Sequence, residues 1–420
     1  MPGLYASIIG ALALGLIYAY YYNGGDTLNY YHSSVCVSKL LTKDPGSFFS
    51  IMAGSFDNEL HFSFDMETRY PFYWGDPHAF AVIRLTTPVI FLAFQQFIPA
   101  SIIVAWITYS GMWKLFQLFN EQFPGHEKWF AFAILFFPSV IFWGSGILKD
   151  TYLLSATAWM IYAFYQMFGK KKWKIRYVII MLICTYILFI IRPFNLFVLL
   201  AGLSVLLLHI SLKNIKGSFI RIALFPVIII VIFGASGVLF NNIAELSGGR
   251  YASLDVMMTQ AYVIQDDLKK DYYGGNTFDI GAFEPTIPGM LSKFPVALMA
   301  GLFRPYLFES RTITMLVSGL ENTLLLALTL YILIQLFMKL LNKGLMPVLK
   351  KSFHHPLITF SFFFSILFAF LVGLTIPNFG SLVRYKITLL PFYLSALFIM
   401  YRTIREEKKA SKGYRQVSVK

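Results

Sequence analysis

The chain has 420 residues, of which 57% are hydrophobic and only 13% are charged. A soluble domain of ordinary composition carries about 25% charged residues, so this composition excludes a soluble enzyme, a disordered chain and a disulfide scaffold. The net charge of +14 does not indicate a nucleic-acid partner, because the basic residues gather between apolar segments, as they do in cytoplasmic loops of membrane proteins. We therefore predict an all-α, polytopic transmembrane helical bundle of about 10–11 spans.

The first apolar segment, residues 4–22, is predicted to be a retained span, because it is too long for a signal peptide and lacks a basic start. Residues 23–97 follow as a predicted outer loop with interfacial helices. Positions 23–78 hold seven acids against three bases, a balance that favours the outer side. Residues 79–97 are apolar enough to cross, but Arg84 and Pro88 favour a position along the outer face.

The remaining chain is predicted to alternate across the membrane as part of one integral membrane domain, residues 1–420. A second outer segment is expected at 241–311 and a basic cytoplasmic tail at 402–420. The five basic residues in 170–176 also belong inside, which places both termini in the cytoplasm. The predicted spans after the first loop are 100–118, 129–143, 151–168, 177–191, 195–209, 222–240, 312–338, 356–376 and 386–401.

Ionisable residues near the membrane are expensive and are therefore functional candidates. Asp26 directly follows the first span, after two glycines and among tyrosines; it is either an interfacial surface acid or a general base in a partly desolvated setting. Lys149 and Asp150 begin a predicted helix. Either Asp150 caps that helix and Lys149 pairs with it, or the helix start and Lys149 form an anion site.

Several further candidates come from different predicted helices but from the same outer side. Guanidinium groups suit bidentate capture of phosphate, so a phosphate-binding cluster is predicted from Lys149, Arg192, Arg304, Arg311 and Arg384. Supporting residues are Asp150, Glu309, Glu321, Asn378 and Tyr385. The alternative for the acids is an ion pair, Glu309–Arg311 or Arg304–Glu321, that only fixes helices. Glu321 and Asn322 are expected to face protein, and Lys386 is interpreted as a snorkelling anchor.

The order of these parts resembles the GT-C superfamily of membrane glycosyltransferases, which use polyprenyl-phosphate-linked sugars. The similarity lies in the acid after the first span (Asp26), the long first outer loop, a short polar turn ending at Asp150, the Arg192-Pro193 turn and a late Arg384-Tyr385 pair. The resemblance implies that Asp26 is the catalytic base. The chain departs from the family pattern where Thr27, not a second acid, follows Asp26, and where Lys149 precedes Asp150.

The resemblance implies a glycosyltransferase that transfers a sugar from a polyprenyl-phosphate donor to an envelope glycan, lipid or protein acceptor at the outer face of a bacterial inner membrane. No cofactor is expected, although a divalent metal remains open, and no nucleic acid or soluble nucleotide is expected as a partner. The string from Asn378 to Tyr385 is also similar to segments of O-antigen-polymerase-like envelope proteins. Polymerisation from a polyprenyl-diphosphate donor is therefore one alternative, and a lipid or polysaccharide flippase is another.

Overall fold

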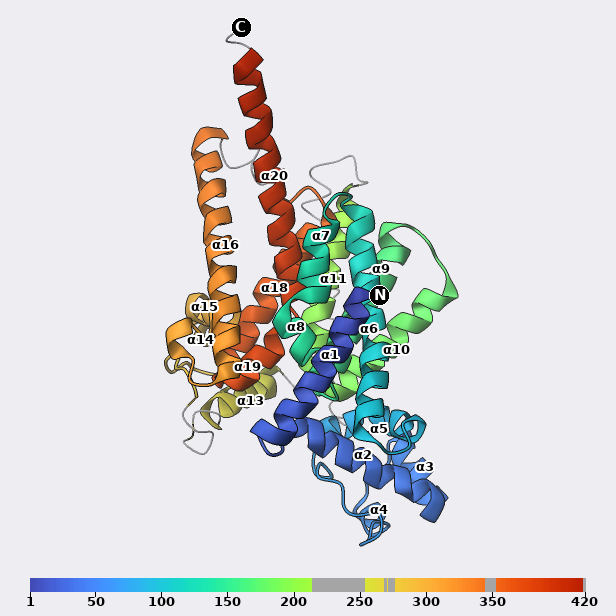
Figure 1. Ribbon diagram of the computed structural model, residues 1–420. Coiled ribbons are helices and arrows are strands. Elements are labelled where there is room, and N and C mark those ends of the chain that lie inside the picture. Colours follow the sequence, from blue (N-terminus) through green and yellow to red (C-terminus); the bar gives the residue numbers. More distant parts are fainter. Residues whose placement is uncertain (214–253, 268–269, 271–275, 344–352, 418–420) are drawn as a thin grey trace. The chain divides into compact units, whose positions relative to one another are not determined.

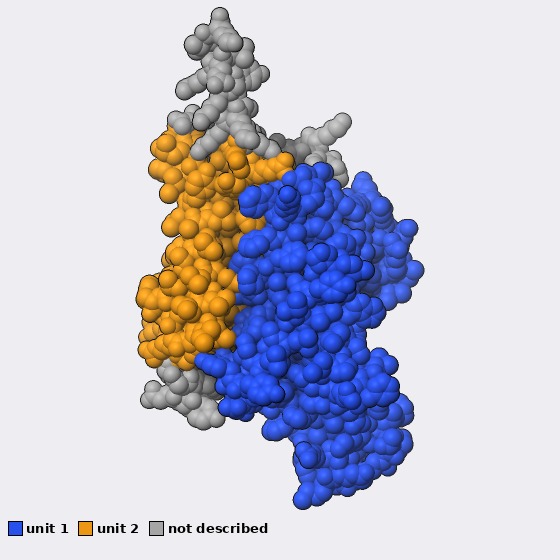
Figure 2. All heavy atoms as spheres, in the orientation of Figure 1, with its two compact units in different colours: residues 1–196 blue, residues 197–420 orange. Residues whose placement is uncertain are grey.

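The computed structural model describes residues 1–213, 254–267, 270, 276–343 and 353–417 (Figure 1). The chain divides into two compact units, residues 1–196 and 197–420 (Figure 2), and each is described by itself. The described residues are predominantly helical, and their one β-bridge is an isolated antiparallel pair between Thr277 and Asn378. The predicted span 222–240 lies outside the described residues.

Unit 1 begins with a helix that continues into a π-helical turn, and it ends within the first turn of the long helix α11, most of which belongs to unit 2. Its elements are α1 (Pro2–Leu16), η1 (Ile17–Tyr21), α2 (Asp26–Lys43), α3 (Pro45–Ala53), α4 (Asn58–His61), α5 (Pro77–Leu92), α6 (Phe97–Gln122), α7 (Glu127–Phe130), η2 (Ala131–Phe136), α8 (Pro138–Trp143), α9 (Lys149–Phe164), η3 (Tyr165–Gly169), α10 (Ile175–Ile191) and α11 (Pro193–Lys213).

Unit 2 contains two long helices, α16 and α20, together with shorter apolar helices that pack against them. Its described elements after α11 are α13 (Leu254–Asp267), α14 (Ile287–Ser292), α15 (Phe294–Phe303), the 3₁₀ turn η5 (Leu307–Glu309), α16 (Ile313–Lys343), α18 (Pro356–Thr375), α19 (Phe379–Lys386) and α20 (Leu390–Val417).

The prediction of an all-α polytopic membrane protein is confirmed. Five described helices are long and apolar enough to cross a membrane: Pro2–Tyr21, Phe97–Gln122, Pro193–Leu212, Ile313–Leu341 and Pro356–Thr375. A sixth span forms if α19 and the first part of α20, which are bent by 62° relative to each other, count as one. The other predicted spans within the described ranges fall on helices that are shorter or interrupted by π-helical turns, so the full number of spans stays a prediction.

Small residues set the closest helix contacts, as is usual where helices pack in lipid. Gly301 of α15 lies against the backbone carbonyl of Ala369 in α18, and Gly373 of α18 lies against the carbonyl of Ala297 in α15. A side chain at either glycine would overlap that carbonyl oxygen. The two glycines therefore allow α15 and α18 to pack backbone to backbone.

The first loop of unit 1 folds into helices that gather beyond the end of α1. Helices α2, α3 and α5 lie together at that end (Figure 1), and α2 packs along α5. Helix α5 has 16 residues and contains Pro88. At 1.5 Å per residue it is about 24 Å long, less than the roughly 30 Å of a hydrocarbon core. Whether residues 79–97 cross, and the side of the membrane on which this loop lies, stay predictions.

Candidate functional site

Asp26 is positioned by the turn that ends the first span. Gly24 and Gly25 have φ values of 141° and 111°, which favour glycine, and Asp26 then begins α2. The Asp26 carboxylate is half-buried and accepts a hydrogen bond of 2.8 Å from the hydroxyl of Tyr73. The ring of Tyr73 packs on Tyr30, with ring centroids 4.8 Å apart. The carboxylate is therefore held in one orientation.

A second carboxylate, Asp76, joins the start of α5 to the start of α9. Its Oδ1 caps α5 by accepting from the backbone amides of His78 and Ala79, at 3.0 and 3.1 Å. Its Oδ2 lies 3.3 Å from the Nζ of Lys149. Burial raises the pKa of Asp76, but the charge of Lys149 and the three hydrogen bonds outweigh burial and lower the pKa overall.

Lys149 lies among charges of both signs at the start of α9, before the predicted span 151–168. Burial lowers the pKa of its ammonium group, and the nearby positive charge of Arg192 lowers it further. The negative charges of Asp76 and Asp26 oppose this change without cancelling it. Asp26, Asp76, Lys149 and Arg192 are thus electrostatically linked, and with Asp150 they form what we call the unit 1 charge cluster.

Asp150 pairs with Arg192 at the end of α10. The Nη1 of Arg192 lies 3.0 Å from Oδ1 of Asp150, whose side chain is only 1% exposed. Helix α9 starts after Leu148 and has no side-chain cap. The predicted alternative in which Asp150 caps this helix and Lys149 pairs with it is therefore wrong, because each residue has a partner from another helix. The guanidinium of Arg192 is partly occupied by this pair.

The predicted site residues of unit 2 form separate contacts. Arg304 pairs with Glu309, with Nε and Oε1 3.5 Å apart, and its guanidinium lies over the ring of Phe278 at 4.9 Å. This pair replaces the two predicted alternatives, Glu309–Arg311 and Arg304–Glu321. Arg311 is exposed, and among the described residues none forms an ion pair with it.

Lys386 is buried rather than a snorkelling anchor, so that interpretation is wrong. Its side chain is 2% exposed. Its Nζ donates to the carbonyls of Leu302 and Arg304, both at 3.1 Å, and to Oδ1 of Asn322 at 2.5 Å. All three donors of the ammonium group are used. Glu321 and Asn322 are both buried, which confirms that they face protein.

The turn before Lys386 brings three predicted residues into one short segment. Asn378 caps α19 by accepting from the amide of Ser381 at 3.1 Å. The backbone around it pairs with residues 276–278 through two hydrogen bonds, Phe278 N to Pro377 O and Phe379 N to Asn276 O. Arg384 and Tyr385 on α19 are half-buried. This pairing fixes the start of α19 against the chain that precedes α14.

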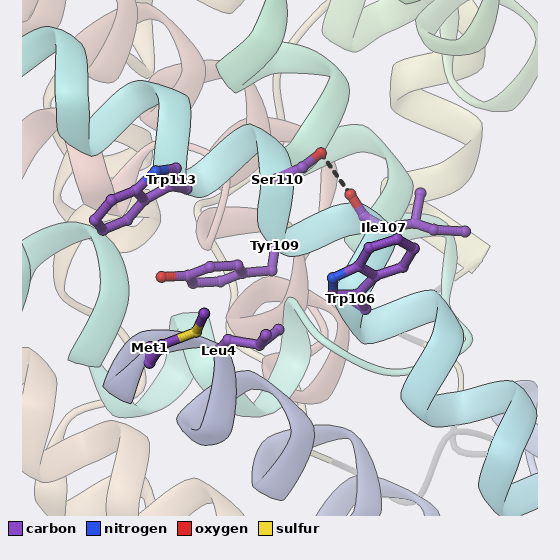
Figure 3. Close-up of a pocket in the computed structure, with 7 residues that line it drawn as sticks. All are labelled: Met1, Leu4, Trp106, Ile107, Tyr109, Ser110 and Trp113. Atoms are coloured by element: carbon purple, nitrogen blue, oxygen red, sulfur yellow. Dashed lines mark hydrogen bonds between the residues drawn. The ribbon is translucent and has the colours of Figure 1, made fainter.

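Two pockets differ in chemistry. The first, about 550 Å³, lies between α1 and α6 (Figure 3) and is lined by Met1, Leu4, Trp106, Ile107, Tyr109, Ser110 and Trp113. Its side chains are apolar or aromatic apart from the Ser110 and Tyr109 hydroxyls, and both helices are candidate spans. The second, about 450 Å³, lies between α13 and the start of α19 and includes Tyr385.

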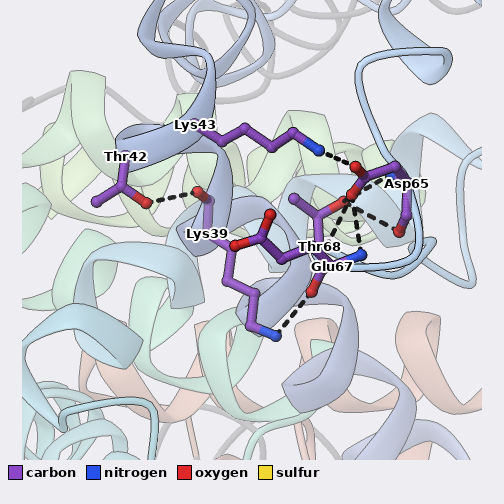
Figure 4. A network of polar contacts seen from close by, with 6 residues as sticks. All are labelled: Lys39, Thr42, Lys43, Asp65, Glu67 and Thr68. Carbon is purple, nitrogen blue, oxygen red and sulfur yellow. Dashed lines mark hydrogen bonds and ion pairs between the residues drawn. The ribbon is translucent and has the colours of Figure 1, made fainter.

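A network of polar contacts holds the first loop against α2 (Figure 4). Asp65 pairs with Lys43 and accepts from the amides of Glu67 and Thr68 at 3.0 and 3.1 Å. Lys39 donates to the carbonyl of Glu67 at 3.0 Å. The ion pair with Lys43 and these amides lower the pKa of Asp65 to about 2. The network holds residues 65–68 in a turn against α2.

Sequence reasoning missed Asp76, Tyr73 and Asn195. Asp76 precedes Pro77, which is a helix-start pattern that the sequence shows, but its pairing with Lys149 is a contact over 73 residues. Asn195, three residues after Arg192, is 1% exposed. Neither the nitrogen nor the oxygen of its side-chain amide has a hydrogen-bond partner among the described residues. A buried amide with both groups unpaired carries an energetic cost.

The structure brings together the four predicted site residues of unit 1: Asp26, Lys149, Asp150 and Arg192. The other seven lie in unit 2, so their convergence with Asp26 stays a prediction. Within the described ranges, no group of three or more His, Cys, Asp or Glu side chains could hold a metal ion. No protein-family model, curated protein or solved structure matches the chain. The fold defines a polytopic α-helical membrane protein, and the resemblance to the GT-C superfamily stays a prediction.

Proposed function

We propose that this protein is a membrane glycosyltransferase that transfers a sugar from a polyprenyl-phosphate donor to an acceptor hydroxyl of an envelope glycan, lipid or protein. The observation that carries the proposal is the unit 1 charge cluster, where the half-buried Asp26 carboxylate lies within the electrostatic reach of Lys149. The cluster stands where the first candidate span ends. A lipid-linked phosphate has its head group at this depth and its tail in the hydrocarbon region.

In the proposed reaction the acceptor oxygen attacks the anomeric carbon of the donor sugar. The bond between that carbon and the phosphate oxygen breaks, the electron pair leaves with the phosphate, and the acceptor proton passes to Asp26. The hydrogen bond from Tyr73 orients the carboxylate. The ammonium group of Lys149 stabilises the departing phosphate, and this interaction is strengthened by its low exposure.

Arg192 has a different role in this proposal from the one first predicted. Its guanidinium is paired with Asp150. In this proposal Arg192 therefore contributes positive charge and fixes the start of α11, and it does not bind phosphate in a bidentate way. Arg304 is likewise bound to Glu309. Lys149 is also paired, with Asp76, but at 3.3 Å this pair is longer than the Arg192–Asp150 pair, and its side chains are more exposed, at 19% and 41%. We therefore assign phosphate binding in unit 1 to Lys149.

The membrane placement is part of the same proposal. The basic segments 170–176 and 402–420 favour a cytoplasmic location for both termini. With the first span crossing once, Asp26 then lies at the outer face of a bacterial inner membrane. No nucleotide is required at that face, because the sugar is already activated by its phosphate.

The proposal is tested with purified protein in liposomes that contain a radiolabelled polyprenyl-phosphate sugar and an acceptor glycolipid. We expect transfer by the native protein and loss of transfer by Asp26→Asn. Asp57→Asn is the matched control, because Asp57 is an exposed acid in the same loop and caps no amide with its side chain. Equal transfer by Asp26→Asn and the native protein would remove Asp26 as the base. Movement of the donor across the bilayer without chemical change would instead indicate a flippase, and addition of many units to one acceptor a polymerase.

A further inference from the structure

The second pocket lies in unit 2 and has a mixed lining. Its volume is about 450 Å³, within the range of roughly 300–1,000 Å³ that small-molecule sites occupy. Two tyrosines and three aliphatic side chains lie beside four polar groups. From α13 the lining residues are Tyr262, Val263, Ile264, Asp266 and Asp267, and Lys270 follows that helix. The others are Ile376, which follows α18, and Ser381 and Tyr385 of α19.

The charges that line this pocket restrict the ligand. Lys270 donates to Asp267, with Nζ and Oδ1 2.8 Å apart, and Asp266 is exposed. An anionic ligand would be repelled by the carboxylate of Asp266, which adds a negative charge beside the neutral Asp267–Lys270 pair. A neutral ligand that carries several hydroxyl groups avoids this repulsion, and it can donate to the carboxylates and accept from the ammonium and hydroxyl groups.

The aromatic side chains of the pocket also restrict the class of ligand. Tyr262 and Tyr385 come from two different helices that line the pocket, α13 and α19. Tyrosine offers an apolar ring face and a polar hydroxyl, which suits a ligand with one face of C–H groups and an edge of hydroxyls. Such a ligand is a sugar ring. The aliphatic side chains of Val263, Ile264 and Ile376 extend the apolar wall.

We propose that this pocket binds a neutral saccharide unit, with Tyr262 and Tyr385 packing against the sugar ring and Asp266, Asp267, Lys270 and Ser381 contacting its hydroxyls. This inference deepens the proposed function and rests on it for the role of the sugar, whereas the ligand class rests on the side chains of the pocket. The wall formed by α19 is preorganised by the Asn378 cap and by the backbone pairing with residues 276–278. Preorganisation lowers the cost of binding.

The test measures direct binding to the full chain in lipid nanodiscs by saturation-transfer difference NMR. The probes are the neutral oligosaccharides cellotriose and triacetylchitotriose, a sulfated heparin trisaccharide and choline. We expect signal from at least one neutral probe and about a tenfold or greater loss of affinity in Tyr262→Leu and in Asp266→Asn. Tyr5→Leu is the matched control, because Tyr5 is an exposed tyrosine of α1 in unit 1, and it should bind as the native chain does.

Asp266→Asn keeps the test informative if a tyrosine variant fails to fold, because Asp266 is exposed. Absence of signal from both neutral probes overturns the proposal, and so does preferential binding of choline or of the heparin trisaccharide. Binding of a neutral probe that the two variants do not reduce also overturns it. Asp26→Asn separates the two proposals. If this variant binds saccharide but does not transfer sugar, both the transferase proposal and the pocket proposal are supported. If the native chain binds saccharide but does not transfer sugar, only the pocket proposal is supported.

Discussion

The guanidinium of Arg192 and the carboxylate of Asp150 form a buried ion pair, with 3.0 Å between Nη1 and Oδ1 and side-chain exposures of 11% and 1%. The pair connects the start of α9 to the point where α10 ends and α11 begins. Removing one partner of a buried pair leaves the other charge uncompensated, whereas replacing both can be nearly neutral.

We therefore predict that Arg192→Met lowers the free energy of unfolding by about 3–5 kcal/mol. The double variant Arg192→Met/Asp150→Leu should recover most of this loss, because it removes both charges. Denaturant titration of the purified protein in detergent micelles measures the free energy of unfolding of both variants. Additive losses in the double variant would show that the pair carries no coupling energy.

The second prediction concerns the pH dependence that Lys149 confers. Burial and Arg192 lower its pKa below the usual value of 10.5 despite the carboxylates of Asp76 and Asp26. The folded chain therefore binds fewer protons at this site than the unfolded chain in the window between the lowered pKa and 10.5, so stability rises with pH there. The melting temperature of the native protein should rise relative to that of Lys149→Met as the pH increases through this window. A constant or falling difference would contradict the prediction.

The third prediction concerns Tyr73, which orients the Asp26 carboxylate. Tyr73→Phe removes the hydroxyl and keeps the ring that packs on Tyr30. A hydrogen bond to a charged group contributes roughly 1.5–3 kcal/mol to stability, so we expect the melting temperature to fall by a few degrees. We also expect the transfer rate to fall by about tenfold or more, because the carboxylate is no longer held in one orientation. Tyr70→Phe, a change at an exposed tyrosine of the same loop, is the control and should keep the native rate.

The fourth prediction separates buried from exposed cations in unit 2. Lys386→Met would leave the carbonyls of Leu302 and Arg304 and the side-chain oxygen of Asn322 without their donor. We expect a loss of stability of about 1–3 kcal/mol for each buried acceptor left unsatisfied, seen as a lower melting temperature or a lower yield of monodisperse protein. Arg311→Gln, at an exposed position, should change stability by no more than about 0.5 kcal/mol. Similar effects of the two substitutions would refute the assignment of Lys386 as a structural cation.

The sequence predicts the helical membrane class because long apolar runs have no other folded solution in lipid. It also places Asp26, Lys149, Asp150 and Arg192 at the same ends of predicted spans, and the structure gathers these four residues. That part of the site is predictable because alternation across a membrane decides which ends of the spans share a side.

Pairing within the cluster is not predictable in the same way. Lys149 pairs with Asp76 across 73 residues rather than with its neighbour Asp150, because helix packing brings the start of α5 to the start of α9. From the sequence, Lys386 is interpreted as a snorkelling anchor. In the structure it lies at the end of α19, before the bend to α20, and its ammonium group contacts carbonyls at the end of α15. Local pattern sets the elements, and tertiary packing selects the partners.

The side of the membrane on which Asp26 lies tests the central claim most directly. Ser55→Cys introduces an exposed thiol into the same loop, and the two native cysteines, Cys36 and Cys184, are buried. Lys172→Cys, in the predicted inner turn, is the matched control. The account predicts that a membrane-impermeant maleimide labels Ser55→Cys in intact cells and labels Lys172→Cys only after permeabilisation. Labelling of Ser55→Cys only after permeabilisation would place Asp26 in the cytoplasm and contradict the proposed chemistry at the outer face.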